Sequence, residues 1–155
     1  MKSFETHGEE ETIELGRRIA ATLPRRAVVL LIGNLGAGKT TLAKGIISGL
    51  GAGEVEDVTS PTFTLIHEYG EGRVYHIDLY RLDREEEVAT LGLEEIFDRE
   101  AVVLIEWGER FLGLMPEGRM EIRLEAGRTD SQVRQITVGR ASRPDENDGV
   151  SGLEA

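Results

Sequence analysis

The sequence contains no cysteine and no long apolar run. Without thiols the chain forms no disulfide and no zinc-thiolate centre, and a cysteine nucleophile is excluded. A membrane-spanning helix needs about 18 or more consecutive apolar residues, and no segment approaches that length. The first five residues also lack the apolar region of a secretory signal. These absences lead us to expect a cytoplasmic protein that does not enter a membrane.

Basic residues are scarce as well. The chain has 18 lysines and arginines against 29 aspartates and glutamates, and its formal net charge is −11. A protein that binds nucleic acid strongly on its own usually presents a basic face, because neutralisation of the phosphates drives such binding. We therefore expect no DNA binding and no strong direct contact with RNA.

The length and composition are those of one globular domain. The 155 residues are 39% hydrophobic and 30% charged, enough to bury a core of ordinary size. Apolar periodicity stops near Gly139, and the remainder is rich in polar residues. We predict a domain over residues 1–138 and a disordered tail over 139–155.

Residues 33–40 match the phosphate-loop pattern G-x-x-x-x-G-K-[ST] at every defined position. The eight residues are Gly33, Asn34, Leu35, Gly36, Ala37, Gly38, Lys39 and Thr40. An apolar run at 27–32 precedes the loop and indicates a buried strand, and helical spacing begins behind it at Thr41. Backbone N–H groups of such a loop converge on anionic oxygens at a helix N-terminus. The motif therefore predicts binding of nucleotide phosphates, with Lys39 on the phosphates and Thr40 at Mg²⁺.

The other segments suggest an α/β fold. A strand or loop and a helix precede residue 26, and strands at 63–69 and 73–80 are separated as in a hairpin. The run 101–106 resembles a central parallel strand, a short helix follows to about Pro116, and alternating segments at 120–125 and 132–138 close the domain. We predict a P-loop NTPase-like three-layer α/β/α domain. Its sheet is mixed and mainly parallel, with β-hairpin additions.

Residues 82–100 form an acidic segment of helical character that carries over half of the net negative charge. We interpret it as a solvated helical face, and a docking surface for a basic partner is the alternative.

Two carboxylates that follow apolar strands are candidates to complete a nucleotide site, Asp78 and Glu106. Glu106 ends five apolar residues, and an ionised group there needs a partner, so we interpret it as functional. Asp78 could equally pair with the nearby Arg81. The segment 60–64 supplies hydroxyls, and it fits either a mobile loop that reaches the nucleotide or an ordinary proline turn.

Four segments occurring in order resemble the TsaE (YjeE) family of small bacterial P-loop ATPases. They are the loop 33–41, which includes Thr41, the segment 60–64, the segment 75–82 (Tyr-His-Ile-Asp-Leu-Tyr-Arg-Leu) and the segment 105–107 (Ile-Glu-Trp). The resemblance covers roughly residues 5–138.

The resemblance implies a Mg²⁺-dependent ATPase, weak alone, that is required for the threonylcarbamoyladenosine modification of tRNA. Such proteins act with TsaD and TsaB, and TsaD performs the transfer, so tRNA is met only indirectly. By position, Lys39, Glu106 and Asp78 would be catalytic, and Thr40 and Glu106 would hold the metal. The loop, Thr41 and Thr62 would bind ATP.

Two other functions fit the residues. A small-molecule P-loop kinase would need an acceptor pocket and an arginine-bearing lid, and no clear lid insertion is visible between 110 and 130. A non-catalytic nucleotide-sensing adaptor is the second. The adenine contacts have no recognisable motif, and Arg134 and the acidic start of the first helix are suspected to lie near the base.

Overall fold

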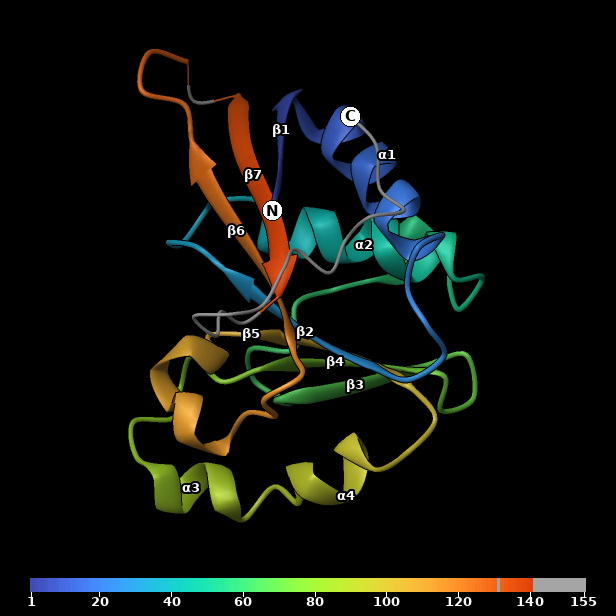
Figure 1. The fold of residues 1–155 in the computed structure, drawn as a ribbon, viewed down its shortest axis with the longest axis vertical. Helices are drawn as coiled ribbons and strands as arrows, with labels where there is room; N and C mark the ends of the chain where they lie inside the picture. Colours follow the sequence, from blue (N-terminus) through green and yellow to red (C-terminus); the bar gives the residue numbers. More distant parts are fainter. Residues whose placement is uncertain (131, 141–155) are drawn as a thin grey trace.

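The computed structural model describes residues 1–130 and 132–140. They form one seven-stranded sheet in the order β1-β7-β6-β2-β5-β4-β3, with helices on both sides (Figure 1). The strands are β1 (Lys2–His7), β2 (Ala27–Ile32), β3 (Ile66–Tyr69), β4 (Val74–Asp78), β5 (Val102–Glu106), β6 (Met120–Ala126) and β7 (Val133–Arg140). The α-helices are α1 (Glu9–Ala20), α2 (Lys39–Gly49), α3 (Glu85–Ala89) and α4 (Leu93–Phe97), and the 3-10 helices are η1 (Val55–Asp57) and η2 (Gly108–Leu114).

The centre of the sheet is parallel and its edges are antiparallel. β2 pairs with β5 on one side and β6 on the other, and β4 pairs with β5, all in parallel. β3 adds to β4, and β7 and β1 add to β6, all in antiparallel pairs. The central strands are buried apolar runs, as expected where helices cover both faces of a sheet.

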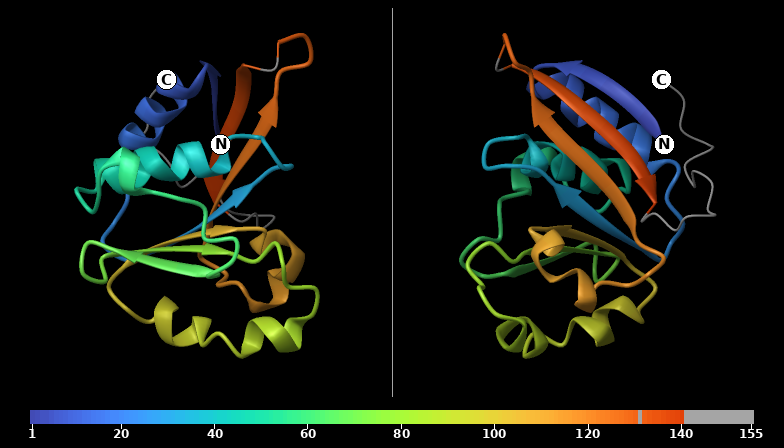
Figure 2. Two further views of the ribbon diagram at one scale, coloured as in Figure 1. Left: turned by 180° about the vertical axis from the view of Figure 1, so that it is seen from behind. Right: turned by 60° about the vertical axis from the view of Figure 1, so that its left-hand side comes forward.

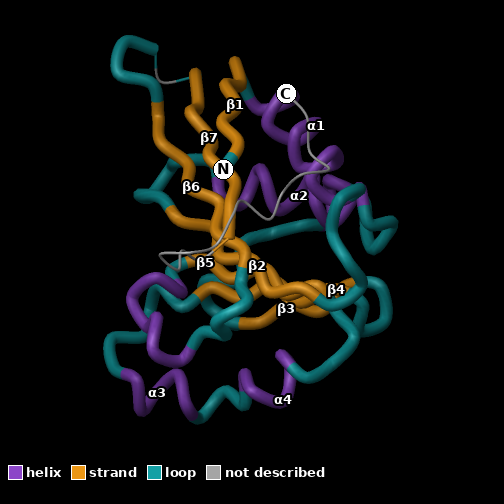
Figure 3. The backbone as a smooth tube through the Cα atoms, in the orientation of Figure 1, coloured by secondary structure: helices purple, strands orange, loops and turns teal. Residues whose placement is uncertain are grey.

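The strands alternate their side chains between two cores. Val74, Leu104 and Leu31 face α1 and α2, whereas Ile77 and Ile105 face α3, α4 and η2. Figure 2 shows these helices on opposite sides, and Figure 3 shows the twisted strands running between them. The α/β three-layer prediction is confirmed.

Helices α1 and α2 approach closely because glycines line their contact. A Cβ on Gly16 would lie 2.6 Å from the Leu42 carbonyl oxygen, and a Cβ on Gly45 would overlap the carbonyl oxygen of Ile13. Only glycine permits this separation of the two backbones.

Several predicted boundaries differ from the structure. The strand predicted at 63–69 begins only at Ile66, because 62–65 form a turn in which Leu65 has φ 70° and donates its N–H to the Pro61 carbonyl. The acidic segment 82–100, predicted to have helical character, contains two short helices, α3 and α4. They are separated at Gly92, whose φ of 71° interrupts the helical path.

At the other end of the domain, β7 continues through Arg140, past the predicted limit at 138, because Arg140 pairs with Met120. The predicted tail beyond Arg140 lies outside the described residues. No helix within 1–130 and 132–140 has the length and apolarity needed to span a membrane.

Candidate active site

The phosphate loop connects the end of β2 to the first turn of α2. Gly36 and Gly38 adopt φ values of 79° and 102°, which side chains other than glycine rarely adopt. Gly33 is required for a different reason: a Cβ there would lie 2.6 Å from the Leu124 carbonyl oxygen of β6. The loop therefore brings its backbone N–H groups to the start of α2, where the helix dipole favours an anion.

Lys39 is almost fully buried, with 4% of its surface exposed. Its Nζ donates to the Gly33 carbonyl oxygen over 2.7 Å and lies 3.6 Å from the centroid of the Trp107 indole. Burial lowers the pKa of Lys39, and the carboxylates of Glu106 and Glu109 oppose that shift. The ammonium is thus held in the site by a carbonyl oxygen and an aromatic face.

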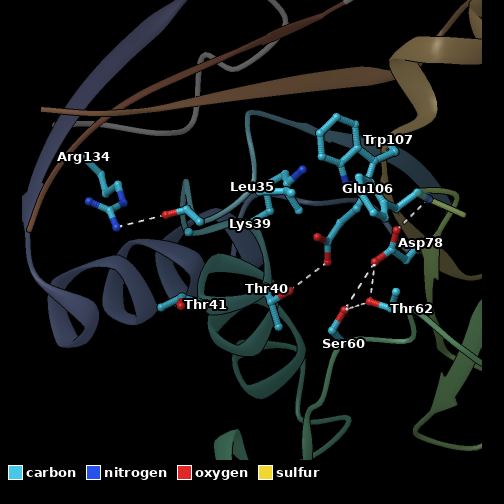
Figure 4. Close-up of a pocket in the computed structure, with 13 residues that line it drawn as sticks. Leu35, Lys39, Thr40, Thr41, Ser60, Thr62, Asp78, Glu106, Trp107 and Arg134 are labelled. Carbon is cyan, nitrogen blue, oxygen red and sulfur yellow. Dashed lines mark hydrogen bonds between the residues drawn. The ribbon is translucent and has the colours of Figure 1, made fainter. Parts of the chain in front are cut away.

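Glu106 ends β5 and lies against the first turn of α2. Its Oε2 accepts a hydrogen bond from the Thr40 hydroxyl at 3.1 Å (Figure 4) and lies 2.6 Å from His76 Nε2. Only 4% of Glu106 is exposed. The predicted metal pair, Thr40 and Glu106, is therefore brought into direct contact although 66 positions separate the two residues.

Asp78 ends β4, level with Glu106 on β5. Its Oδ2 accepts hydrogen bonds from Ser60 (3.3 Å) and Thr62 (3.1 Å), and its Oδ1 accepts one from the Tyr80 backbone N–H at 2.9 Å. No ion pair joins Asp78 to Arg81 within the described part of the chain. Thr62 and Asp78 therefore belong to one hydrogen-bonded group at the site, as Figure 4 shows.

A cavity of about 360 Å³ contains most of the predicted residues. Its lining consists of Leu35, Gly36, Gly38, Lys39, Thr40, Thr41, Ser60, Thr62, Asp78, Tyr80, Glu106, Trp107 and Arg134. Three predicted residues do not line it. Gly33 contributes its carbonyl to Lys39, and Asn34 and Ala37 face a neighbouring hollow beside Leu124.

Four lining residues are not among the predicted catalytic, ATP-binding or metal-binding residues: Ser60, Tyr80, Trp107 and Arg134. Tyr80 packs against Trp107 with ring centroids 5.1 Å apart, so the segment after β4 reaches the segment after β5. Arg134, suspected near the base, donates from Nη2 to the Gly36 carbonyl oxygen at 3.2 Å. No local pattern reveals this contact, because it depends on the pairing of β7 with β6.

The donor set fits Mg²⁺. The Thr40 hydroxyl and the Glu106 carboxylate supply hard oxygens at the N-terminus of α2, beside a loop suited to phosphates. Mg²⁺ takes few protein ligands, keeps several waters and completes its shell with phosphate oxygens.

The chain is similar to proteins of one family over most of its length. The model of a family described as "Threonylcarbamoyl adenosine biosynthesis protein TsaE" matches residues 6–136. A protein named tRNA threonylcarbamoyladenosine biosynthesis protein TsaE from Nostoc sp. is 43% identical over 135 residues, covering 83% of this chain and 81% of its own. A protein of the same name from Bacillus subtilis is 39% identical over 139 residues, covering 88% and 85%.

A solved structure has the same fold. The crystal structure of YdiB from Bacillus subtilis superposes with a TM-score of 0.70 at 34% identity, covering 88% of this chain and 83% of that one.

Proposed function

This chain belongs to the TsaE family of tRNA threonylcarbamoyladenosine biosynthesis, and from that membership and its site we propose that it binds ATP with Mg²⁺ and hydrolyses it. The observation that carries the proposal is the contact of Thr40 with Glu106 beside the buried Lys39. It joins a phosphate loop to a strand-end carboxylate, the two parts that phosphoryl transfer requires.

Each residue of the site has a role in ATP hydrolysis that follows from its chemistry. Lys39 and the loop N–H groups stabilise negative charge that spreads over the γ-phosphoryl oxygens. Thr40 and Glu106 would hold Mg²⁺, which would neutralise part of the negative charge of the nucleotide phosphates. Asp78 and Thr62 lie where they can orient the attacking water. Water oxygen bonds to the γ-phosphorus as the bond to the ADP oxygen breaks, and the water proton leaves with inorganic phosphate or solvent.

The base has a candidate position beside the phosphates. A hollow of about 190 Å³ adjoins the loop and shares Gly38, Thr41 and Arg134 with the main cavity. Its remaining lining includes Glu9 and Thr12 at the start of α1. We place adenine there, because this hollow adjoins the phosphate-loop cavity through residues that line both.

We further propose that ATP turnover is coupled to TsaD and TsaB, as the family resemblance implies, and that tRNA is met only through them. Two large apolar side chains beside the nucleotide cavity support a protein contact there. Leu35, on the loop, is 67% exposed, and Phe63, next to Thr62, is 82% exposed. A partner protein that covers Leu35 would contact the phosphate loop directly, and one that covers Phe63 would contact the hydroxyl-bearing segment 60–64.

The test is ATP hydrolysis by the purified protein with Mg²⁺ and no added metabolite, with and without TsaD and TsaB. We expect slow release of phosphate that the two partners change, and loss of threonylcarbamoyladenosine from tRNA when the protein is depleted. Phosphate transfer that requires an added metabolite would identify a kinase instead. Nucleotide binding without turnover under every condition would identify an adaptor.

A further inference from the structure

His76 is a buried polar residue that the proposed mechanism does not use. It lies at the middle of β4, none of its surface is exposed, and it pairs with His67 on β3 and Leu104 on β5. Because side chains alternate along a strand, His76 shares its face with Asp78 two positions on. That face is the one covered by α1 and α2, where the neighbouring Val74 and Leu104 are apolar.

The imidazole has one strong contact. Its Nε2 lies 2.6 Å from Glu106 Oε2, whereas its Nδ1 is buried without a hydrogen-bond partner among residues 1–130 and 132–140. A proton on Nε2 makes that nitrogen a donor to the carboxylate oxygen. An apolar side chain could fill the core at this position, so packing alone does not require a histidine. What the histidine provides beyond packing is an N–H directed at Glu106.

The contact falls on an oxygen that is already engaged. Oε2 of Glu106 accepts from both Thr40 and His76, and no hydrogen bond reaches Oε1 within the described residues. Thr40 sits on α2 and His76 on β4, so two separate elements hold the same oxygen. A carboxylate held in this way cannot rotate freely about its last torsion, and Oε1 keeps a constant position.

We propose that His76 is a positioning residue: it fixes the Glu106 carboxylate for Mg²⁺ and water through the Nε2 hydrogen bond. The inference rests on the proposed ATP hydrolysis and assigns His76 no contact with the nucleotide. Residues that orient a metal-binding group in other proteins change metal affinity or activity by about 10- to 100-fold when replaced.

Two variants separate positioning from simple packing. Glutamine can place its amide N–H near the position of Nε2, whereas asparagine is shorter and places its amide near Nδ1. Both side chains are polar and uncharged, so both variants have a similar free-energy cost of burying an amide group. His76→Leu removes the donor and fills the space, and a melting curve shows whether each variant is folded.

The first measurement is steady-state ATP hydrolysis. At saturating ATP and Mg²⁺, His76→Asn and His76→Leu are expected to lower kcat by about tenfold or more, and His76→Gln to restore most of kcat. Equal kcat values for the glutamine and asparagine variants would overturn the proposal. If the wild-type protein itself released no phosphate, the proposed function would fail instead.

The second measurement does not require turnover. Calorimetry gives the affinity for a non-hydrolysable ATP analogue with Mg²⁺ and with EDTA, in the wild type, His76→Asn, Glu106→Gln and the double variant. We expect His76→Asn to reduce the gain in affinity that Mg²⁺ provides, and to have no further effect once Glu106 is replaced. Independent effects of the two substitutions, or an unchanged gain in His76→Asn, would show that His76 does not act through Glu106.

Discussion

The ammonium of Lys39 lies 3.6 Å from the centre of the Trp107 ring while it donates to the Gly33 carbonyl. A lysine of a phosphate loop is expected to bind phosphate oxygens, so the proposed ATP binding predicts a change in this arrangement. Trp107 is the one tryptophan of the sequence. Its indole therefore reports on the position of Lys39.

We expect ATP to change the fluorescence of Trp107, because phosphates draw the cation away from the indole face. Titration with ATP and Mg²⁺ gives the emission change, and calorimetry gives the affinity for the same samples. Lys39→Ala is the control, since it should weaken binding and remove the cation that perturbs the ring. Binding seen by calorimetry with constant Trp107 emission would contradict this expectation.

Glu106→Gln should separate hydrolysis from binding. Glutamine keeps the size of the side chain but removes the charge that faces Thr40 and the metal. We expect kcat to fall about 100-fold or more, with the affinity for ATP measured in EDTA within a few-fold of wild type. Glu68→Gln, an exposed change on β3, is the matched control. Parallel losses of turnover and binding would mean that Glu106 only maintains the shape of the site.

Gly45→Ala should destabilise the fold. Alanine favours an exposed helix over glycine by roughly 1 kcal/mol. Here its methyl group would overlap the Ile13 carbonyl of α1, so the backbones of α1 and α2 must move apart. We expect the free energy of unfolding to drop by about 1–3 kcal/mol in urea titrations. Gly113→Ala is the control, because the added methyl group would meet no other atom within 4 Å, and it should not lose stability.

Glu109 should make stability depend on pH. Burial raises the pKa of its carboxyl above the ordinary 4.5, against the opposing charges of Lys39 and Arg110, and its Oε1 is buried without a partner in the described structure. A group whose pKa is raised by folding binds its proton more tightly in the native state. Its contribution to stability is complete below the unfolded pKa and is lost as the pH rises through the folded value.

Glu109→Gln mimics the protonated carboxyl and should escape that loss. We expect a higher melting temperature than wild type at about pH 7.5 and little difference at about pH 4. Glu86→Gln on the exposed side of α3 should not show this pattern. A variant that is less stable than wild type at the higher pH would indicate that the negative charge of Glu109 stabilises the folded protein, for example by attracting Lys39.

Local sequence patterns predicted those elements whose structure is determined by residues close together in the sequence. The strand–loop–helix unit around Gly33–Thr40, the β3–β4 hairpin and the apolar β5 each have a periodicity or turn signal of their own. The sequence indicated helical character over 82–100 but not its division at Gly92, because the acidic residues on both sides of Gly92 share a helical composition. The start of β3 was placed too early because Phe63 and Thr64 favour strands by type, whereas the turn at Leu65 decides their conformation.

The candidate site was predictable only in part. Asp78 and Glu106 could be placed at one edge of the sheet because parallel strands end together. The contact of His76 with Glu106 and that of Arg134 with Gly36 depend on strand neighbours distant in sequence. No periodicity within 74–78 or 133–140 distinguishes these side chains from ordinary strand residues.

The place of β2 in the sheet has a consequence for synthesis on the ribosome. This strand leads into the phosphate loop, and its two neighbours in the sheet are β5 and β6. The carbonyl oxygen of Gly36 in the loop accepts a hydrogen bond from Arg134 on β7. While the chain is still being made, residues 27–40 have left the ribosome long before these partners. A nascent chain that stops before β6 therefore lacks a neighbour of β2 and cannot close the loop against β7. The complete phosphate loop, with its contact to β7, therefore forms late, when almost the whole domain has been translated.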